Sequence, residues 1–123
     1  MQQSDGAGLT FKATPHLAII IPFREDETEI IRRDQLRWLL FYLIPILQRQ
    51  QKIFKIFVIS QDFEGSWNKG RLFNIGFKIA KSEGFNCFVL HDVDMIMEDD
   101  RAILGFFYDN NIFFFSFFNK LLF

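Results

Sequence analysis

Three apolar runs separated by two helix-like segments constrain the fold of this chain more than any other feature. The runs cover residues 17–21, 53–60 and 85–90. Each run is nearly continuous, whereas a half-exposed strand would alternate apolar and polar residues. Continuous short runs are typical of strands that are buried on both faces of a sheet. The sequence therefore predicts three buried strands.

The segments between these runs have the spacing of helices. From Asp34 onward, leucines recur at steps of three and four residues, which predicts a helix with a kink or an early stop at Pro45. A second helix is predicted over residues 67–84, with Gly65 in the turn before it and Gly84 at its stop. Strands and helices that alternate with short connections predict an α/β fold with a largely parallel sheet.

The chain has 123 residues, which fits one small domain. Residues 1–15 are polar and are predicted to be a disordered linker, followed by a folded domain over residues 16–101. Residues 102–123 are rich in phenylalanine and follow neither a helical nor a strand period. We interpret them as an aberrant tail.

Composition excludes several classes of protein. The net charge is −1, which argues against a nucleic-acid binder. The single cysteine excludes a disulfide within the chain. There is no uncharged apolar run of membrane-spanning length, so we expect no membrane span in this chain.

Residues capable of chemistry follow each of the three predicted strands. Residues 22–24 follow the first, 60–62 the second, and 91–94 the third. Ligands of parallel sheets bind at the carboxyl ends of the strands. The sequence therefore predicts one binding site to which all three segments contribute.

Two carboxylates, Asp92 and Asp94, carry the clearest chemical signal at this edge. Alternate residues of an extended segment point the same way, so we expect both to face one site. Neighbouring carboxylates favour a nearby cation, and oxygen ligands suit Mg²⁺ or Mn²⁺, which can hold a diphosphate. The alternative is that the aspartates only cap a turn.

Basic and aromatic residues near the same edge complete the candidate site. Arg24, Lys69 and Arg71 are suited to phosphate binding, or are solvated surface charges. Phe23 and Trp67 are suited to stacking on a base, or belong to the core.

Five sequence blocks give the chain a recognisable resemblance. In order they are "HLAIIIPFR", "LRWLLFYLIPILQRQQ", "IFVISQ", "WNKGRLFNIGF" and "CFVLHDVDMIMEDDR". Over residues 16–101 this series resembles the amino-terminal half of the catalytic domain of the β-1,4-galactosyltransferase family. The resemblance implies a GT-A-type, Rossmann-like fold. It also implies inverting, Mn²⁺-dependent transfer of galactose from UDP-galactose to the 4-hydroxyl of a terminal N-acetylglucosamine in a glycan, in the Golgi. Some relatives use UDP-N-acetylgalactosamine instead.

The resemblance also implies a set of site residues. It places the nucleotide-sugar site at Pro22, Phe23, Arg24, Arg32, Trp67, Lys69, Asp92 and Val93, and the first manganese ligand at Asp94. Trp67 and Lys69 stand where the family has Phe and Arg. The second arginine of the family pattern "PFRxR" corresponds to Asp26, or to Arg32 if residues 25–30 are an insertion.

Departures from the family pattern lie mainly after Arg101. The family pairs the cysteine at the Cys87 position with a later one, and its tryptophan-glycine-rich acidic block supplies the catalytic carboxylate. A later Met and His complete its metal site. None of these residues occurs in this sequence. We therefore expect a truncated domain that is inactive alone. The alternatives are a non-catalytic fragment from a faulty gene model and a related UDP-N-acetylgalactosamine transferase.

Overall fold

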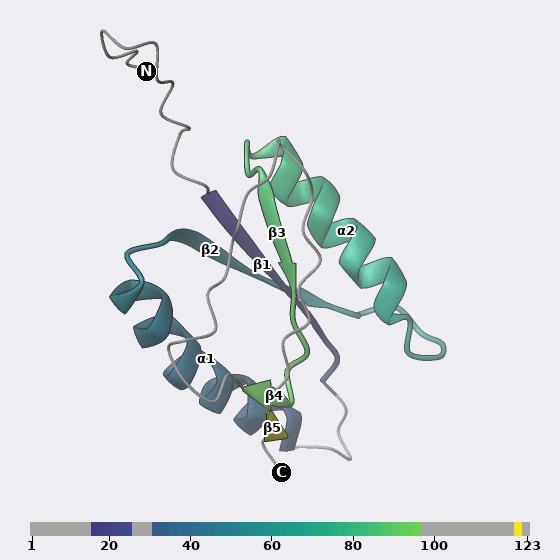
Figure 1. Cartoon of the computed structure of the whole chain (residues 1–123). Coiled ribbons are helices and arrows are strands. Elements are labelled where there is room, and N and C mark those ends of the chain that lie inside the picture. The colour runs from purple at the N-terminus through teal and green to yellow at the C-terminus, as the bar shows by residue number, and fades with distance from the viewer. Residues whose placement is uncertain (1–15, 26–30, 97–119, 122–123) are drawn as a thin grey trace, which may run out of the picture.

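A parallel three-stranded sheet lies between two helices (Figure 1). The computed structural model describes residues 16–25, 31–96 and 120–121. Its elements are β1 (His16–Phe23), α1 (Ile31–Arg49), β2 (Ile53–Ser60), α2 (Lys69–Ser82), β3 (Cys87–Leu90), β4 (Met95–Ile96) and β5 (Lys120–Leu121). The sheet order is β2-β1-β3, and β4 pairs antiparallel with β5. The predicted α/β fold with a parallel sheet is confirmed. The predicted linker and all of the predicted tail except β5 lie outside the described residues.

Strand β1 lies at the centre of the sheet and is covered on both faces. Its residues Leu17, Ile19 and Ile21 pack in one apolar cluster with α1. Ala18 and Ile20 pack in a second cluster on the face of α2. Five successive residues, 17–21, are fully buried, which explains why the run is continuous in the sequence.

Strand β2 is less buried than its sequence predicts. Ile53 and Val58 are 49% and 39% exposed. The prediction of a fully buried strand is wrong here, because β2 pairs with β1 on one side and is an edge strand of the described sheet. Sequence composition does not distinguish an edge strand from a central one when both are apolar.

Helix α1 begins three residues before its predicted start and passes through Pro45. Of the predicted kink or early stop, the early stop is wrong, because Ile46 and Leu47 are buried in the cluster beneath β1 and hold the last turn in place; the kink remains a prediction. An interior proline removes one backbone hydrogen bond and crowds the carbonyl four residues earlier, and this packing offsets both costs.

Gln51 ends helix α1 in a left-handed conformation, with φ 55°. The N–H groups of Gln51 and Lys52 donate to the carbonyls of Gln48 and Leu47, at 3.0 and 3.1 Å. This is the Schellman arrangement, in which glycine is the preferred residue at the left-handed position.

Gln51→Gly is therefore expected to raise the free energy of unfolding by roughly 0.5–1 kcal/mol. The left-handed conformation costs a non-glycine residue about 1–2 kcal/mol, and the greater backbone freedom of unfolded glycine cancels part of this gain. Urea unfolding measures the difference. Gln48→Gly, inside α1, is the matched control and should lose about 1 kcal/mol. A loss at both positions would contradict the interpretation.

Helix α2 begins after Asn68, whose side-chain oxygen accepts a hydrogen bond from the Arg71 N–H at 3.1 Å. This N-cap sets the first turn next to the carboxyl end of β1. The chain leaves the helix through Gly84, with φ +91°, and Gly65 precedes the helix with φ +121°. Both predicted glycine roles are confirmed. Among the residues that the structure describes, neither α1 nor α2 is long and apolar enough to cross a membrane.

Cys87 lies at the start of β3 and is fully buried beside β1. Burial raises the pKa of its thiol to about 11, against a smaller opposing effect of Lys52. The thiol is therefore protonated at neutral pH and has a packing role.

Candidate nucleotide-sugar site

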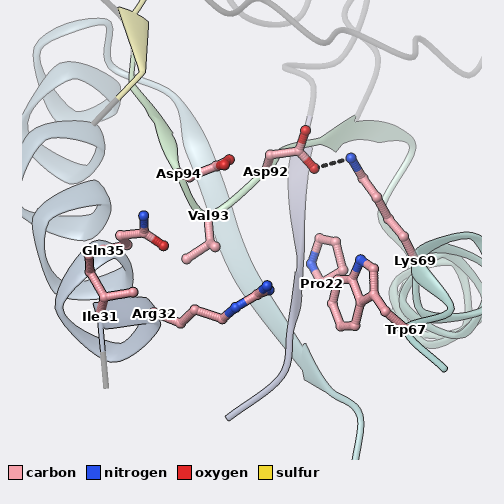
Figure 2. Close-up of a pocket in the computed structure, with 9 residues that line it drawn as sticks. All are labelled: Pro22, Ile31, Arg32, Gln35, Trp67, Lys69, Asp92, Val93 and Asp94. Carbon is pink, nitrogen blue, oxygen red and sulfur yellow. Dashed lines mark ion pairs between the residues drawn. The ribbon is translucent and has the colours of Figure 1, made fainter. Parts of the chain in front are cut away.

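A pocket of about 430 Å³ opens at the carboxyl ends of β1 and β3, where the sequence predicts a site. Residues 60–62 after β2, which were expected to contribute as well, do not line it. Four segments of the chain line it: the end of β1, the start of α1, the loop before α2 together with the first residue of α2, and the segment after β3. The lining residues are Pro22, Ile31, Arg32, Gln35, Trp67, Lys69, Asp92, Val93 and Asp94, as Figure 2 shows. Parallel strands deliver their carboxyl ends to one edge, so segments far apart in sequence meet there.

Seven of the nine predicted site residues line this pocket. The two exceptions are neighbours in sequence. Phe23 is buried in the cluster beneath α1, on the same face of β1 as Leu17, Ile19 and Ile21. Arg24 directs its guanidinium to the carbonyl of Gly65, at 2.9 Å. Nucleotide contact by Phe23 and Arg24 remains a prediction.

Two lining residues, Ile31 and Gln35, are absent from the sequence-based site. They lie four residues apart, on the face of α1 that also presents Arg32. Because the helix was predicted to begin at Asp34, Ile31 was placed outside it. The four-residue spacing that puts Ile31 and Gln35 on one helix face was therefore not recognised.

The Asp-Val-Asp segment reaches the pocket by a turn and not by an extended strand. Strand β3 ends at Leu90, and Val93 and Asp94 lie in a turn. The expectation that Asp92 and Asp94 point the same way because they alternate along an extended strand is therefore wrong. Both Asp92 and Asp94 nevertheless line the pocket, with the largely buried Val93 between them.

The pocket holds opposing charges. The Lys69 ammonium forms an ion pair with the Asp92 carboxylate (Figure 2). Asp94 makes no ion pair with any other residue that the structure describes. Lys69 therefore neutralises Asp92, whereas the charge of Asp94 is available to a cation.

Arg32 and Trp67 face each other across the pocket. The Arg32 guanidinium lies 5.7 Å from the centre of the Trp67 ring, and Figure 2 shows it extending from α1 toward Pro22 and Trp67. A cation over an indole face is attracted by the negative charge of that face. The contact links the start of α1 to the loop before α2 and presents a second positive charge beside Lys69.

His91 lies directly beneath this site and is 3% exposed. Its Nδ1 lies 2.7 Å from the carbonyl oxygen of Asp92. A carbonyl only accepts, so Nδ1 carries the proton. Burial lowers the pKa of the imidazole below its usual 6.5, and the hydrogen bond to Asp92 and the charges of Asp92 and Asp94 partly oppose this.

Stability is expected to fall as the pH is lowered through 6.5. The unfolded chain protonates His91 near pH 6.5, whereas the folded chain keeps it neutral to a lower pH, so acid favours unfolding. The contribution is at most about 1.4 kcal/mol per pH unit. His91→Asn keeps a donor near the Nδ1 position and removes the titration. Urea unfolding between pH 7.5 and 5.5 should therefore show a shallower pH slope for the variant, and identical slopes would refute this.

The parallel sheet with a pocket at the carboxyl ends of its strands is the arrangement of a GT-A-type fold, and comparison with solved structures supports this fold class. A catalytic domain of Drosophila β-1,4-galactosyltransferase 7, in complex with xylobiose, superposes with a TM-score of 0.63 at 24% identity. A mutant of the same Drosophila protein, in complex with manganese, UDP-Gal and xylobiose, gives a TM-score of 0.66 at 25% identity. Each match covers 77% of this chain and 37% of the solved chain.

Sequence comparison gives the family. Residues 7–106 match the N-terminal region of glycosyl transferase group 7. Mouse β-1,4-galactosyltransferase 1 is 49% identical over 90 residues, which are 72% of this chain and 21% of the mouse protein. A Lymnaea stagnalis β-1,4-N-acetylglucosaminyl-transferase is 51% identical over 85 residues, 68% of this chain and 16% of the snail protein. The chain belongs to glycosyl transferase group 7 and is β-1,4-galactosyltransferase-like. It spans about a fifth of the length of the mouse protein and about a sixth of that of the snail protein.

Proposed function

We propose that this pocket binds the UDP part of UDP-galactose together with Mn²⁺, as the donor site of a β-1,4-galactosyltransferase. The observation that carries the proposal is the meeting of two cations, Arg32 and Lys69, with two carboxylates, Asp92 and Asp94, at one edge of the sheet. A nucleoside diphosphate with a divalent cation matches this mixture of charges.

The two cations are suited to the diphosphate. Lys69 is the first residue of α2, where free backbone N–H groups and the helix dipole favour an anion. Arg32 approaches from α1 on the other side of the pocket. An arginine can donate two parallel hydrogen bonds to one phosphate, whereas a lysine acts as a point charge. The diphosphate would therefore lie between the two elements.

Asp94 is the residue we assign to the metal. Mg²⁺ and similar ions often use one or two carboxylates and take their remaining ligands from substrate phosphates and water. Within the described ranges, no group of three or more His, Cys, Asp or Glu side chains could hold a metal. A metal held by the Asp94 carboxylate, the diphosphate and water is consistent with the absence of such a group. When bound, the ion would neutralise charge on the departing UDP.

Sequence similarity over the matched region does not distinguish the donor sugar. The snail relative is named for transfer of N-acetylglucosamine, and the mouse relative is named for transfer of galactose, yet both align with this chain at about half identity. We assign galactose as donor sugar and an N-acetylglucosamine-terminated glycan as acceptor because of the family resemblance. UDP-N-acetylgalactosamine is the alternative donor. The Golgi location rests on the same resemblance.

We also propose that the 123-residue polypeptide does not transfer sugar by itself. Inverting transfer needs a base that removes the proton of the acceptor hydroxyl. In this account Asp94 holds the metal and Asp92 is paired with Lys69, so neither pocket carboxylate is assigned to that task.

A nuclear magnetic resonance titration with UDP tests the proposal. With Mg²⁺ present, UDP should shift the amides of Lys69, Asp92 and Asp94, with a dissociation constant near 1 mM, which is about 4 kcal/mol. Uridine, which has no diphosphate, is the matched control and should bind more weakly. Absence of shifts at the pocket would contradict the site, and binding much tighter than millimolar would contradict its incompleteness.

A further inference from the structure

Gln61 is one of two buried polar residues in the described part of the chain, and it does not line the pocket. It follows the last residue of β2 and is 6% exposed. Its backbone N–H donates to the Phe23 carbonyl at 2.8 Å, which continues the pairing of β1 with β2 by one residue. The side chain is therefore held at the base of the loop that leads to α2.

The Gln61 amide hydrogen-bonds to three backbone groups of that loop. Its Nε2 donates to the carbonyl of Ser66 at 3.2 Å and, more weakly, to that of Phe63 at 3.5 Å. Its Oε1 accepts from the N–H of Asn68 at 3.0 Å. A glutamine amide has two donors and one acceptor group, so both donors and the acceptor are engaged.

Two further contacts hold the same loop from outside. The Arg24 guanidinium donates to the carbonyl of Gly65, and the Arg71 guanidinium lies 4.5 Å from the centre of the Phe63 ring. Each contact joins the loop to a different element, the end of β1 or the first turn of α2.

We propose that Gln61 is a positioning residue of the donor pocket. It acts by fixing residues 61–68, which place Trp67 at the pocket and set the start of α2 that carries Lys69. This inference deepens the proposed function and rests on it for the identity of the ligand. The placement of Trp67 and Lys69 can be measured without a ligand.

Gln61→Glu is the sharpest test, because the variant keeps the shape and loses both donors. At pH 7.5 a carboxylate would face the carbonyls of Phe63 and Ser66, so the loop should be released. The indole N–H resonance of Trp67, identified with Trp67→Phe, should move or broaden without ligand. The dissociation constant for UDP, measured from the shifts at the pocket, should rise at least threefold. Asn74→Asp, an exposed amide-to-carboxylate change in α2, should leave both readouts unchanged.

Lowering the pH should restore the Trp67 resonance in Gln61→Glu. A general packing defect would not be reversed by acid. Protonation of the introduced carboxylate restores one O–H donor, so the Trp67 resonance should return toward its wild-type position as the pH is lowered. If Gln61→Glu fails to fold, Gln61→Met keeps a side chain of similar length without a charge, removes the three hydrogen bonds of the Gln61 amide and should broaden the same resonance.

An unchanged Trp67 resonance in Gln61→Glu at pH 7.5, or in Gln61→Met where the first variant fails to fold, would overturn the inference. The same is true of a shift in Gln61→Glu that acid does not reverse. The ligand-free measurement decides this inference alone. Failure of wild-type protein to bind UDP would instead contradict the proposed function.

Discussion

Gly76→Ala is expected to lower the free energy of unfolding by about 1–2 kcal/mol. A Cβ atom at position 76 would lie 2.5 Å from Cγ2 of Ile20 and 3.0 Å from Cγ1 of Ile59. Ile20 is fully buried in the central strand β1, and its Cγ2 is attached directly to a branched Cβ that rotates little. Overpacking of this kind costs about 1–3 kcal/mol, or more when nothing yields. The better helix propensity of alanine returns about 1 kcal/mol, so the clash dominates.

Gly70→Ala is the matched control in the same helix. A Cβ atom there would meet nothing within 4 Å, so only the propensity gain remains, up to about 1 kcal/mol. The two substitutions are chemically identical and should have opposite signs in urea unfolding. If both stabilised the protein, the close approach of α2 to β1 and β2 would be wrong.

Asp94→Asn is expected to remove the metal-dependent part of UDP binding. The amide has nearly the shape of the carboxylate but lacks its charge, and hard divalent cations favour charged oxygen ligands. UDP affinity in the presence of Mg²⁺ should fall at least tenfold, or about 1.4 kcal/mol. Without metal, the variant and the wild-type protein should bind UDP equally weakly, and the UDP titration measures both.

Asp62→Asn is the control for Asp94→Asn. Asp62 is exposed in the loop after β2 and does not line the pocket. Its substitution changes the net charge by the same amount and should leave UDP binding unchanged. Equal losses in both variants would indicate a general electrostatic effect, and the assignment of Asp94 to the metal would be abandoned.

The arrangement of strands was largely predictable from the sequence, and the reason is visible in β1. Its continuous apolar run requires cover on both faces, and α1 and α2 supply it. The exposure of β2 was not predictable, because the sequence does not state which strand lies at the centre. The persistence of α1 beyond Pro45 depends on the burial of Ile46 and Leu47, a tertiary effect that outweighs the local propensity.

Most of the candidate site was also predictable, since the carboxyl ends of parallel strands must meet. The burial of Phe23 could have been predicted from the alternation of side chains along β1. Phe23 continues the odd-numbered series Leu17, Ile19 and Ile21, which faces the core beneath α1. Gln61 was marked in the sequence only by its place among residues 60–62 after β2, and no such pattern indicated its positioning role. Its hydrogen bonds go to the backbone of the loop, and backbone partners leave no trace in residue types.

Paramagnetic broadening by Mn²⁺ tests the central claim most directly. A bound Mn²⁺ ion broadens the resonances of nearby nuclei, so the experiment locates the metal without any assumption about activity. With UDP present and Mn²⁺ at a small fraction of the protein concentration, the amides of Asp92, Val93 and Asp94 should broaden first. Asp94→Asn should abolish this pattern. Broadening that begins instead at an exposed acidic residue away from the pocket, such as Glu83 at the opposite end of α2 from Lys69, would contradict the account.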